Sequence, residues 1–105
     1  MNRGEIWFFE FKKPDKPRPV LILTRQETLP YLNTVTIAPI TRTIRGVPSE
    51  IMLGPKEGLK EPCVANLHHL NTVSKADLKK FVGSLSDEKM NELKEALLFA
   101  LGFND

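Results

Sequence analysis

Residues 18–40, RPVLILTRQETLPYLNTVTIAPI, decide the fold class of this chain. The nearly pure apolar run Val20–Thr24 is typical of a central strand. A polar turn follows over Gln26–Asn33, and the alternating β-branched residues of Thr34–Ile40 predict a second strand. Because proline has no amide hydrogen, we expect Pro39 at a strand end, an edge or a bulge. The stretch therefore predicts two strands joined by a turn.

More strand segments lie on either side of this stretch. Met1–Phe11 reads as a first strand, with Gly4 marking a bend or bulge near its start. We expect Phe8 and Phe11 in the core and Trp7 at a dimer surface. Downstream, the pattern predicts short strands over Ser49–Leu53, Cys63–Leu67, Leu70–Val73 and Phe81–Leu85.

Two loops carry most of the positive charge of the first half. One is KKPDKPRP at residues 12–19, where three prolines exclude a helix, and the other is TRTIRG at Thr41–Gly46. Residues 1–60 hold 10 Lys/Arg and 6 Asp/Glu, whereas residues 61–105 hold 5 and 7. This asymmetry fits an anionic ligand on one side of the molecule, although small domains also acquire such asymmetry by chance.

The hydrophobic period changes to that of a helix near the C-terminus. Ser74–Asp77 is a capping box that opens a short helical turn, and Ser86 is placed to cap a long helix that Gly102 ends. Many short strands followed by one amphipathic helix, with no βαβ alternation, predict a mainly β fold. We expect a small antiparallel barrel with a C-terminal helix packed on it, as one domain over residues 1–105. The apolar stripe of that helix comprises Met90, Leu93, Ala96, Leu97, Ala100 and Leu101.

The composition limits the cellular setting. The apolar fraction of 41% argues against disorder, and no apolar run approaches the roughly 20 residues that span a bilayer. The N-terminal residues lack a signal-peptide pattern. Cys63 is the sole cysteine, so no internal disulfide forms, which fits a reducing compartment. We therefore expect a cytoplasmic protein with no membrane partner.

Several of these segments, in this order, resemble the MazF/PemK toxins. The family pattern is an RG-[DE]-[IV]-[WY] strand, a loop, and then R-P-V/A leading into an apolar strand. Here these are Arg3–Trp7 and Arg18–Val20, followed by Ala38–Thr41 as the family's apolar strand that ends in threonine. The VANLHHLNTVSKADL stretch is similar to the family's next strand and short helix, with His68-His69 where the family often has Glu-Gln.

The resemblance covers nearly the whole chain and carries functional implications. It implies an SH3-like barrel, a homodimer, and a toxin of a type II toxin–antitoxin system. The activity it implies is sequence-selective, metal-independent cleavage of single-stranded RNA, which leaves 2′,3′-cyclic phosphate and 5′-OH ends. The implied protein partner is a cognate antitoxin that covers the RNA groove.

Arg18 and Thr41 match the catalytic positions of this family. A guanidinium forms a planar fork to phosphate oxygens, and Pro19 restricts the backbone of Arg18 to the extended region. The Thr41 hydroxyl can donate to a non-bridging phosphate oxygen. On the residues alone, a surface arginine and a strand-end threonine are the simpler interpretations. Because arginine keeps its proton in proteins, we assign Arg18 to charge stabilisation and leave the proton transfers open.

Further residues are expected to contact RNA. His68 and His69 would face opposite sides of a strand, so only one would line a groove, where histidine suits proton transfer. A satisfied or solvated histidine is the alternative for each. Adjacent strand histidines cannot both bind one ion, so neither a metal nor another cofactor is expected. The predicted RNA-binding residues are Lys16, Arg25, Arg42, Arg45 and His69.

Two other functions remain open on the sequence. A non-catalytic toxin related to the gyrase poisons would act through the C-terminal helix, although the ending LLFALGFND is unlike that branch. An inactive barrel that only binds antitoxin or nucleic acid is the other alternative. The departure of His68-His69 from the family pattern leaves this alternative open.

Overall fold

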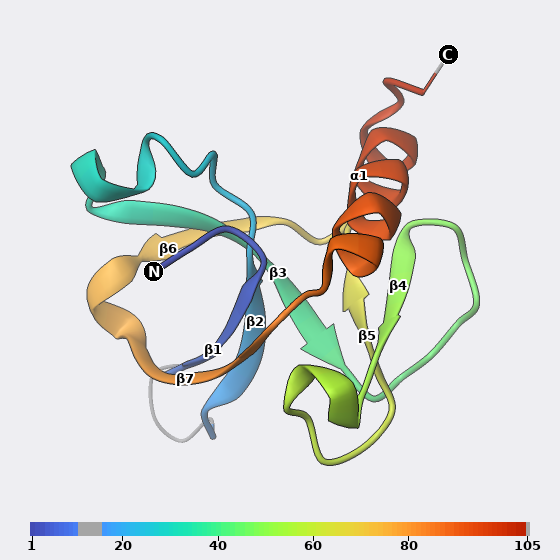
Figure 1. Cartoon of the computed structure of the whole chain (residues 1–105), viewed down its shortest axis with the longest axis horizontal. Coiled ribbons are helices and arrows are strands. Elements are labelled where there is room, and N and C mark those ends of the chain that lie inside the picture. Colours follow the sequence, from blue (N-terminus) through green and yellow to red (C-terminus); the bar gives the residue numbers. More distant parts are fainter. Residues whose placement is uncertain (11–15, 105) are drawn as a thin grey trace.

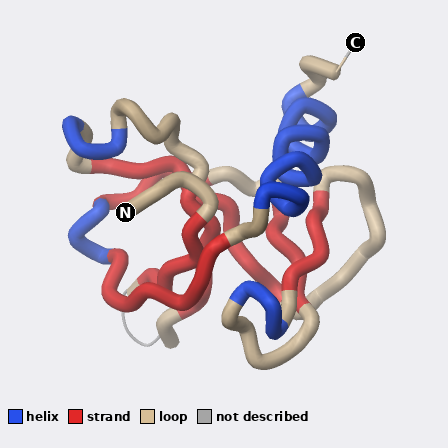
Figure 2. The backbone as a smooth tube through the Cα atoms, in the orientation of Figure 1, coloured by secondary structure: helices blue, strands red, loops and turns tan. Residues whose placement is uncertain are grey.

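A computed structural model describes residues 1–10 and 16–104, which form a strongly curled antiparallel sheet with one α-helix against it (Figures 1 and 2). The sheet order is β4-β5-β3-β2-β1-β7, and β6 pairs with β3. The predicted mainly β barrel with a C-terminal helix is confirmed. The strands are β1 (Glu5–Phe9), β2 (Arg18–Ile22), β3 (Thr34–Thr41), β4 (Glu50–Leu53), β5 (Cys63–Asn66), β6 (Asn71–Ser74) and β7 (Leu78–Ser84). The helix is α1 (Asp87–Leu101), and the short 3-10 helices are η1 (Leu29–Tyr31), η2 (Pro55–Glu57) and η3 (Lys75–Asp77).

Strand β2 is buried on both of its faces. Leu21 and Leu23 belong to a core between the sheet and α1, whereas Val20 and Ile22 belong to a second core inside the curl of β1, β2 and β3. Side chains alternate across a strand, so a strand between two cores needs an unbroken apolar run. This explains the VLIL sequence and confirms the predicted central strand.

Pro39 lies within β3, at the point where that strand changes partners. Residues 34–37 of β3 pair with β6, and residues 40–41 pair with β5. The carbonyl of Thr36 accepts a hydrogen bond from Leu23, so alternation directs the nitrogen of Pro39 away from β2 and into the gap between β6 and β5. The missing amide hydrogen thus costs no ladder hydrogen bond. The proline occupies a break in pairing rather than a strand end.

Arg3 and Gly4 anchor the first strand to the second. The Arg3 Nε atom donates to the carbonyl oxygen of Leu23 at 2.9 Å, and the Gly4 amide donates to that of Ile22 at 2.9 Å. Gly4 has φ +89°, and a Cβ there would lie 2.6 Å from the Met90 sulfur of α1. Only glycine combines this backbone angle with that close approach. Arg3 and Gly4 therefore hold the start of β1 against β2 and α1.

The C-terminal helix covers one core with the predicted stripe. The hydroxyl of Ser86 accepts a hydrogen bond from the Lys89 amide at the N-terminus, and Gly102 ends the helix, as predicted. Leu93 and Ala96 are buried against the sheet. The stripe residues Met90, Leu97 and Ala100 are partly buried against the same core, and Leu101 is half exposed. Among the described residues, no helix is long and apolar enough to cross a membrane.

The structure also corrects two expectations. Phe8 is only partly buried and lies outside both cores, because its cross-strand partner Pro19 sits near the open end of the sheet. The last strand, predicted over Phe81–Leu85, runs from Leu78 to Ser84. Phe11, which was predicted in the core, and residues 12–15 of the loop 12–19 lie outside the described residues.

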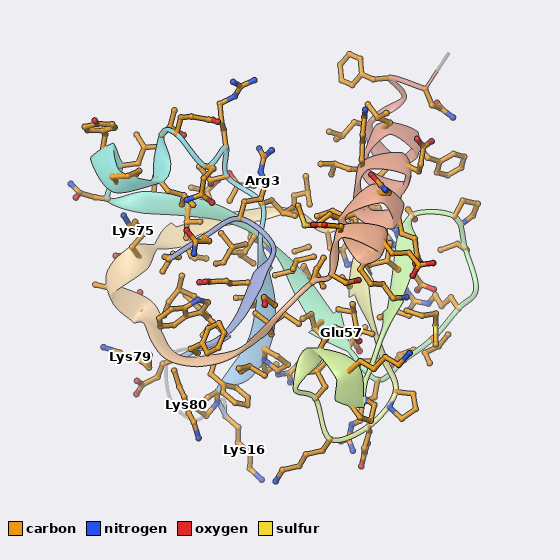
Figure 3. The ribbon with its side chains drawn as sticks, viewed as in Figure 1. Arg3, Lys16, Glu57, Lys75, Lys79 and Lys80 are labelled. Atoms are coloured by element: carbon orange, nitrogen blue, oxygen red, sulfur yellow. The ribbon has the colours of Figure 1, made fainter. Side chains whose placement is uncertain are left out.

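Gly83 provides a test of how β7 meets η2 (Figure 3 labels Glu57 of η2). A Cβ at Gly83 would collide with the backbone carbonyl of Glu57, and backbone cannot swing aside. We expect Gly83→Ala to lower the free energy of unfolding by about 1–3 kcal/mol, as overpacking does. Urea denaturation followed by circular dichroism measures this.

Gly54→Ala is the matched control, since a Cβ there would have its nearest neighbour 4.0 Å away on an extended backbone. If the two variants are equally stable, the contact between β7 and η2 is looser than described.

Candidate functional site

The two candidate catalytic residues come together through the pairing of β2 with β3. The register pairs Val20 with Pro39. Continued two residues toward the start of β2, the same register sets Arg18 opposite Thr41. Directly opposite residues of antiparallel strands lie close together on one face of the sheet. Two residues that are distant in the sequence are therefore neighbours at one end of the barrel.

A cleft of about 660 Å³ opens where these strand ends meet. The start of β2, with Lys16 just before it, and the end of β3 lie toward the same end of the molecule (Figures 1 and 3). Four cationic side chains and one carboxylate line the cleft among the described residues, which suits a polyanionic ligand. The polar lining residues are Lys16, Arg18, Thr41, Arg42, Thr43, Lys60, Glu61 and Cys63, and the apolar ones are Phe8, Pro19, Ile40 and Leu59.

The hydroxyl of Thr41 is held by the loop that follows it. Thr41 Oγ1 accepts a hydrogen bond from the Thr43 amide at 3.2 Å. Because the oxygen is used as an acceptor there, its own hydrogen remains free to be donated. On its other side, Thr41 pairs with Val64 of β5. The strand pairing and the loop amide together orient a hydroxyl donor beside Arg18.

Arg42 and Glu61 form an ion pair within the cleft. The Arg42 Nη1 atom lies 3.0 Å from Glu61 Oε2, and the two side chains are 75% and 55% exposed. The hydrogen bond to Glu61 raises the pKa of Arg42 above its already high value. Such an exposed pair contributes little to stability. Its main effect is to fix the direction of both side chains over the cleft.

Cys63 lies behind this ion pair. Its thiol donates to the Glu61 carbonyl at 3.3 Å, and the residue is 7% exposed. Burial raises the pKa of the Cys63 thiol, and the nearby Glu61 carboxylate raises it further. The thiol is therefore protonated at neutral pH, which makes it a poor nucleophile.

Two of the predicted RNA-binding cations lie elsewhere. Arg25 follows β2, and its guanidinium lies 3.9 Å from the Glu27 carboxylate on the open surface. Arg45 lies in the loop between β3 and β4, where its amide donates to the Glu50 carboxylate at 3.2 Å. Neither residue lines the cleft, whereas Lys16 and Arg42 do.

The adjacent histidines occupy a turn between β5 and β6 rather than a strand. The expectation that they face opposite sides is therefore wrong, and their rings make an edge contact at 4.8 Å. His68 Nδ1 lies 2.5 Å from Ser49 Oγ, and His69 Nδ1 lies 3.3 Å from Asn66 Nδ2. Neither histidine lines the cleft with Arg18. Within residues 1–10 and 16–104, no group of three or more His, Cys, Asp or Glu is arranged to hold a metal ion.

Phe8, Lys60 and Glu61 line the cleft although no sequence pattern predicts them there. Alternation places Phe8 on the same face as buried Ile6, which is why it was assigned to the core. Lys60 and Glu61 lie in the turn-rich segment before β5, whose path no local pattern specifies. No sequence signal separates Glu61 from an ordinary surface glutamate.

Comparison with known proteins identifies relatives over most of the chain. Residues 2–101 match the family model described as PemK-like, MazF-like toxin of type II toxin-antitoxin system. The endoribonuclease MazF3 of Mycobacterium tuberculosis is 41% identical over 83 residues, covering 79% of this chain and 81% of that protein. The probable endoribonuclease MazF5 of the same species is 36% identical, covering 94% and 91%. The solved structure of M. tuberculosis toxin MazF-mt6 is 36% identical with a TM-score of 0.88, covering 96% and 99%.

The environment of Cys63 gives a test of the cleft. We expect iodoacetamide to alkylate the thiol at least ~10-fold more slowly in the native protein than in urea, because both burial and the raised pKa reduce the thiolate available. Mass spectrometry at neutral pH follows the reaction, with N-acetylcysteine in the same urea as the reference. Equal rates in the native and unfolded states would show that the cleft wall leaves the Cys63 thiol accessible to the reagent.

Proposed function

This chain belongs to the PemK-like, MazF-like toxins of type II toxin–antitoxin systems, and on that premise we propose that it is an endoribonuclease that cuts single-stranded RNA without a metal ion. The observation that carries the proposal is that Arg18 and Thr41 line the same cleft, together with further cations. Two curated relatives more than 30% identical over most of the chain are named as endoribonucleases, one of them as probable, which supports the same reaction.

The reaction uses a nucleophile that RNA itself supplies. The 2′-oxygen attacks the adjacent phosphorus, a 2′,3′-cyclic phosphate forms, and the 5′-oxygen of the next nucleotide leaves as a 5′-OH. The enzyme has to stabilise negative charge on the non-bridging oxygens, remove the 2′ proton and allow protonation of the leaving oxygen. DNA, which has no 2′-OH, is not a substrate for this route.

Arg18 and Thr41 suit the stabilisation of that charge. A guanidinium donates two parallel hydrogen bonds to phosphate oxygens and stays charged throughout. The Thr41 hydroxyl, oriented by the Thr43 amide, adds a third donor beside it. Donors held in place before the reaction need no reorganisation as charge develops, and losing one such donor costs about 10²–10³ in rate. Lys16 and Arg42, which line the same cleft, are placed for neighbouring phosphates.

The family membership also supports partners for this chain. We propose a homodimer, and a cognate antitoxin as the protein that blocks RNA binding. A cytoplasmic location follows from this proposal, because both RNA and a co-produced antitoxin are found there.

The assignment of Arg18 and Thr41 is tested by substitution. We expect Arg18→Ala and Thr41→Ala each to reduce cleavage by at least about 10²-fold, because each removes a donor to the developing charge. The measurement is the rate of 5′-OH end formation on a long mixed-sequence RNA in EDTA. Circular dichroism should show an unchanged fold, because neither side chain is buried in a core.

Lys94→Ala on α1 and Thr72→Ala on β6 are controls that remove a cation and a threonine hydroxyl away from the cleft. If both cleft variants cut RNA at wild-type rates while the controls do likewise, the site is elsewhere.

A further inference from the structure

Glu61 is an unexpected group in a cleft that binds phosphates. It is the one carboxylate among the described lining residues, beside the cations Lys16, Arg18, Arg42 and Lys60. A negative charge repels an RNA backbone and therefore weakens binding. We expect a carboxylate at this position to have a role that a cation cannot have. Besides its ion pair with Arg42, the two such roles are acceptance of a hydrogen bond from a base and acceptance of a proton.

Among the described side chains that line the cleft, no group other than Glu61 suits the role of proton acceptor. Lysine and arginine are protonated at neutral pH and cannot serve. The raised pKa of Cys63 keeps its thiol protonated, and Thr41 and Thr43 are not bases. The two histidines lie outside the cleft. Of the side chains that the structure places along the cleft, Glu61 is therefore the one suited to accept a proton.

The ion pair with Arg42 leaves the carboxylate half free. Glu61 Oε2 accepts the hydrogen bond from Arg42, and Oε1 has no hydrogen-bond partner among the described residues. Arg42 directly follows Thr41 in the chain, which brings the pair next to the proposed phosphate site. One oxygen is thus anchored, and the other is available to accept a hydrogen bond or a proton, as a general base requires.

We propose that Glu61 is the general base of this enzyme, a role that rests on the proposed RNA cleavage. Oε1 takes the proton of the substrate 2′-OH as the 2′-oxygen forms its bond to phosphorus. The bond from phosphorus to the 5′-oxygen then breaks with its electron pair, and that oxygen takes a proton from water. Glu61 later returns its proton to solvent. Arg18 and Thr41 hold the negative charge while this happens, and Arg42 positions the carboxylate.

The pH dependence of cleavage tests the proposal. The substrate is a short RNA that carries the mapped cut site, cleaved in EDTA from about pH 5 to about pH 9. We expect Glu61→Gln to lower kcat by about 10²–10³-fold with KM nearly unchanged, and to abolish the rise of the rate with pH on the acidic side. In Glu61→Ala, added formate should restore part of the rate by occupying the space of the missing carboxylate.

Two control variants separate base catalysis from positioning. Glu27→Gln removes an exposed carboxylate that pairs with an arginine away from the cleft, and it should behave as wild type. Arg42→Met should slow cleavage yet keep the acid-side dependence, because the base remains.

Four results would overturn the proposal. One is a Glu61→Gln rate equal to wild type, or a lower rate with the acid-side dependence intact, which would leave Glu61 as a partner of Arg42 only. Another is an unchanged rate with a changed cut site, which would make Glu61 a base-reading residue. If wild-type protein cuts no RNA, the proposed function fails and this role fails with it.

Discussion

The burial of β2 on both faces is the constraint on which the rest of the structure depends. Val20 and Ile22 fill one core and Leu21 the other, each at most 1% exposed. Each such side chain contributes about 1.5–3 kcal/mol when it is fully buried. A one-residue slip of β2 would exchange the two sets of side chains between cores of different shape. The register of β2 against β1 and β3 is therefore fixed by packing on both sides.

That register determines where the chemistry lies. The apolar run begins at Val20. The two residues before it, Arg18 and Pro19, are the first residues of β2 and lie at the open end of the sheet. The same register brings the end of β3 alongside, so Thr41 lies opposite Arg18 without any local signal that joins them. A site at the ends of β2 and β3 is carried by strands that the two cores hold rigidly. Such rigidity suits donors that have to be in place before the charge develops.

The sequence predicted the secondary-structure elements better than it predicted which residues lie side by side in the fold. The strand segments, the Ser86 cap and the stripe of α1 are local patterns of period, caps and propensity, and the structure has them. Arg18 and Thr41 could be named from a resemblance, but their juxtaposition depends on the pairing register. Pro39 was expected at a strand end, an edge or a bulge. The sheet accommodates this proline because β3 changes its partner strand there, which only the tertiary structure shows.

The incorrect predictions have the same cause, because local sequence does not specify tertiary contacts. Phe8 lies on the same face of β1 as buried Ile6, yet it belongs to neither core and lines the cleft instead. Glu61 enters the cleft because the long connection before β5 folds back across the end of β3, and its composition does not encode that path. The histidine pair was expected to have strand geometry although it falls between the predicted strands Cys63–Leu67 and Leu70–Val73, and the chain turns there after Asn66.

The central claim is that the Arg18–Thr41 end of the barrel holds the scissile phosphate of RNA. A crystal structure of the protein with an oligonucleotide that has 2′-deoxyribose at the cut site tests this most directly, because such a substrate binds without reacting. The account predicts one phosphate with its non-bridging oxygens about 2.7–3.0 Å from the Arg18 guanidinium and the Thr41 hydroxyl. A scissile phosphate bound at another surface, with this cleft empty, would contradict it.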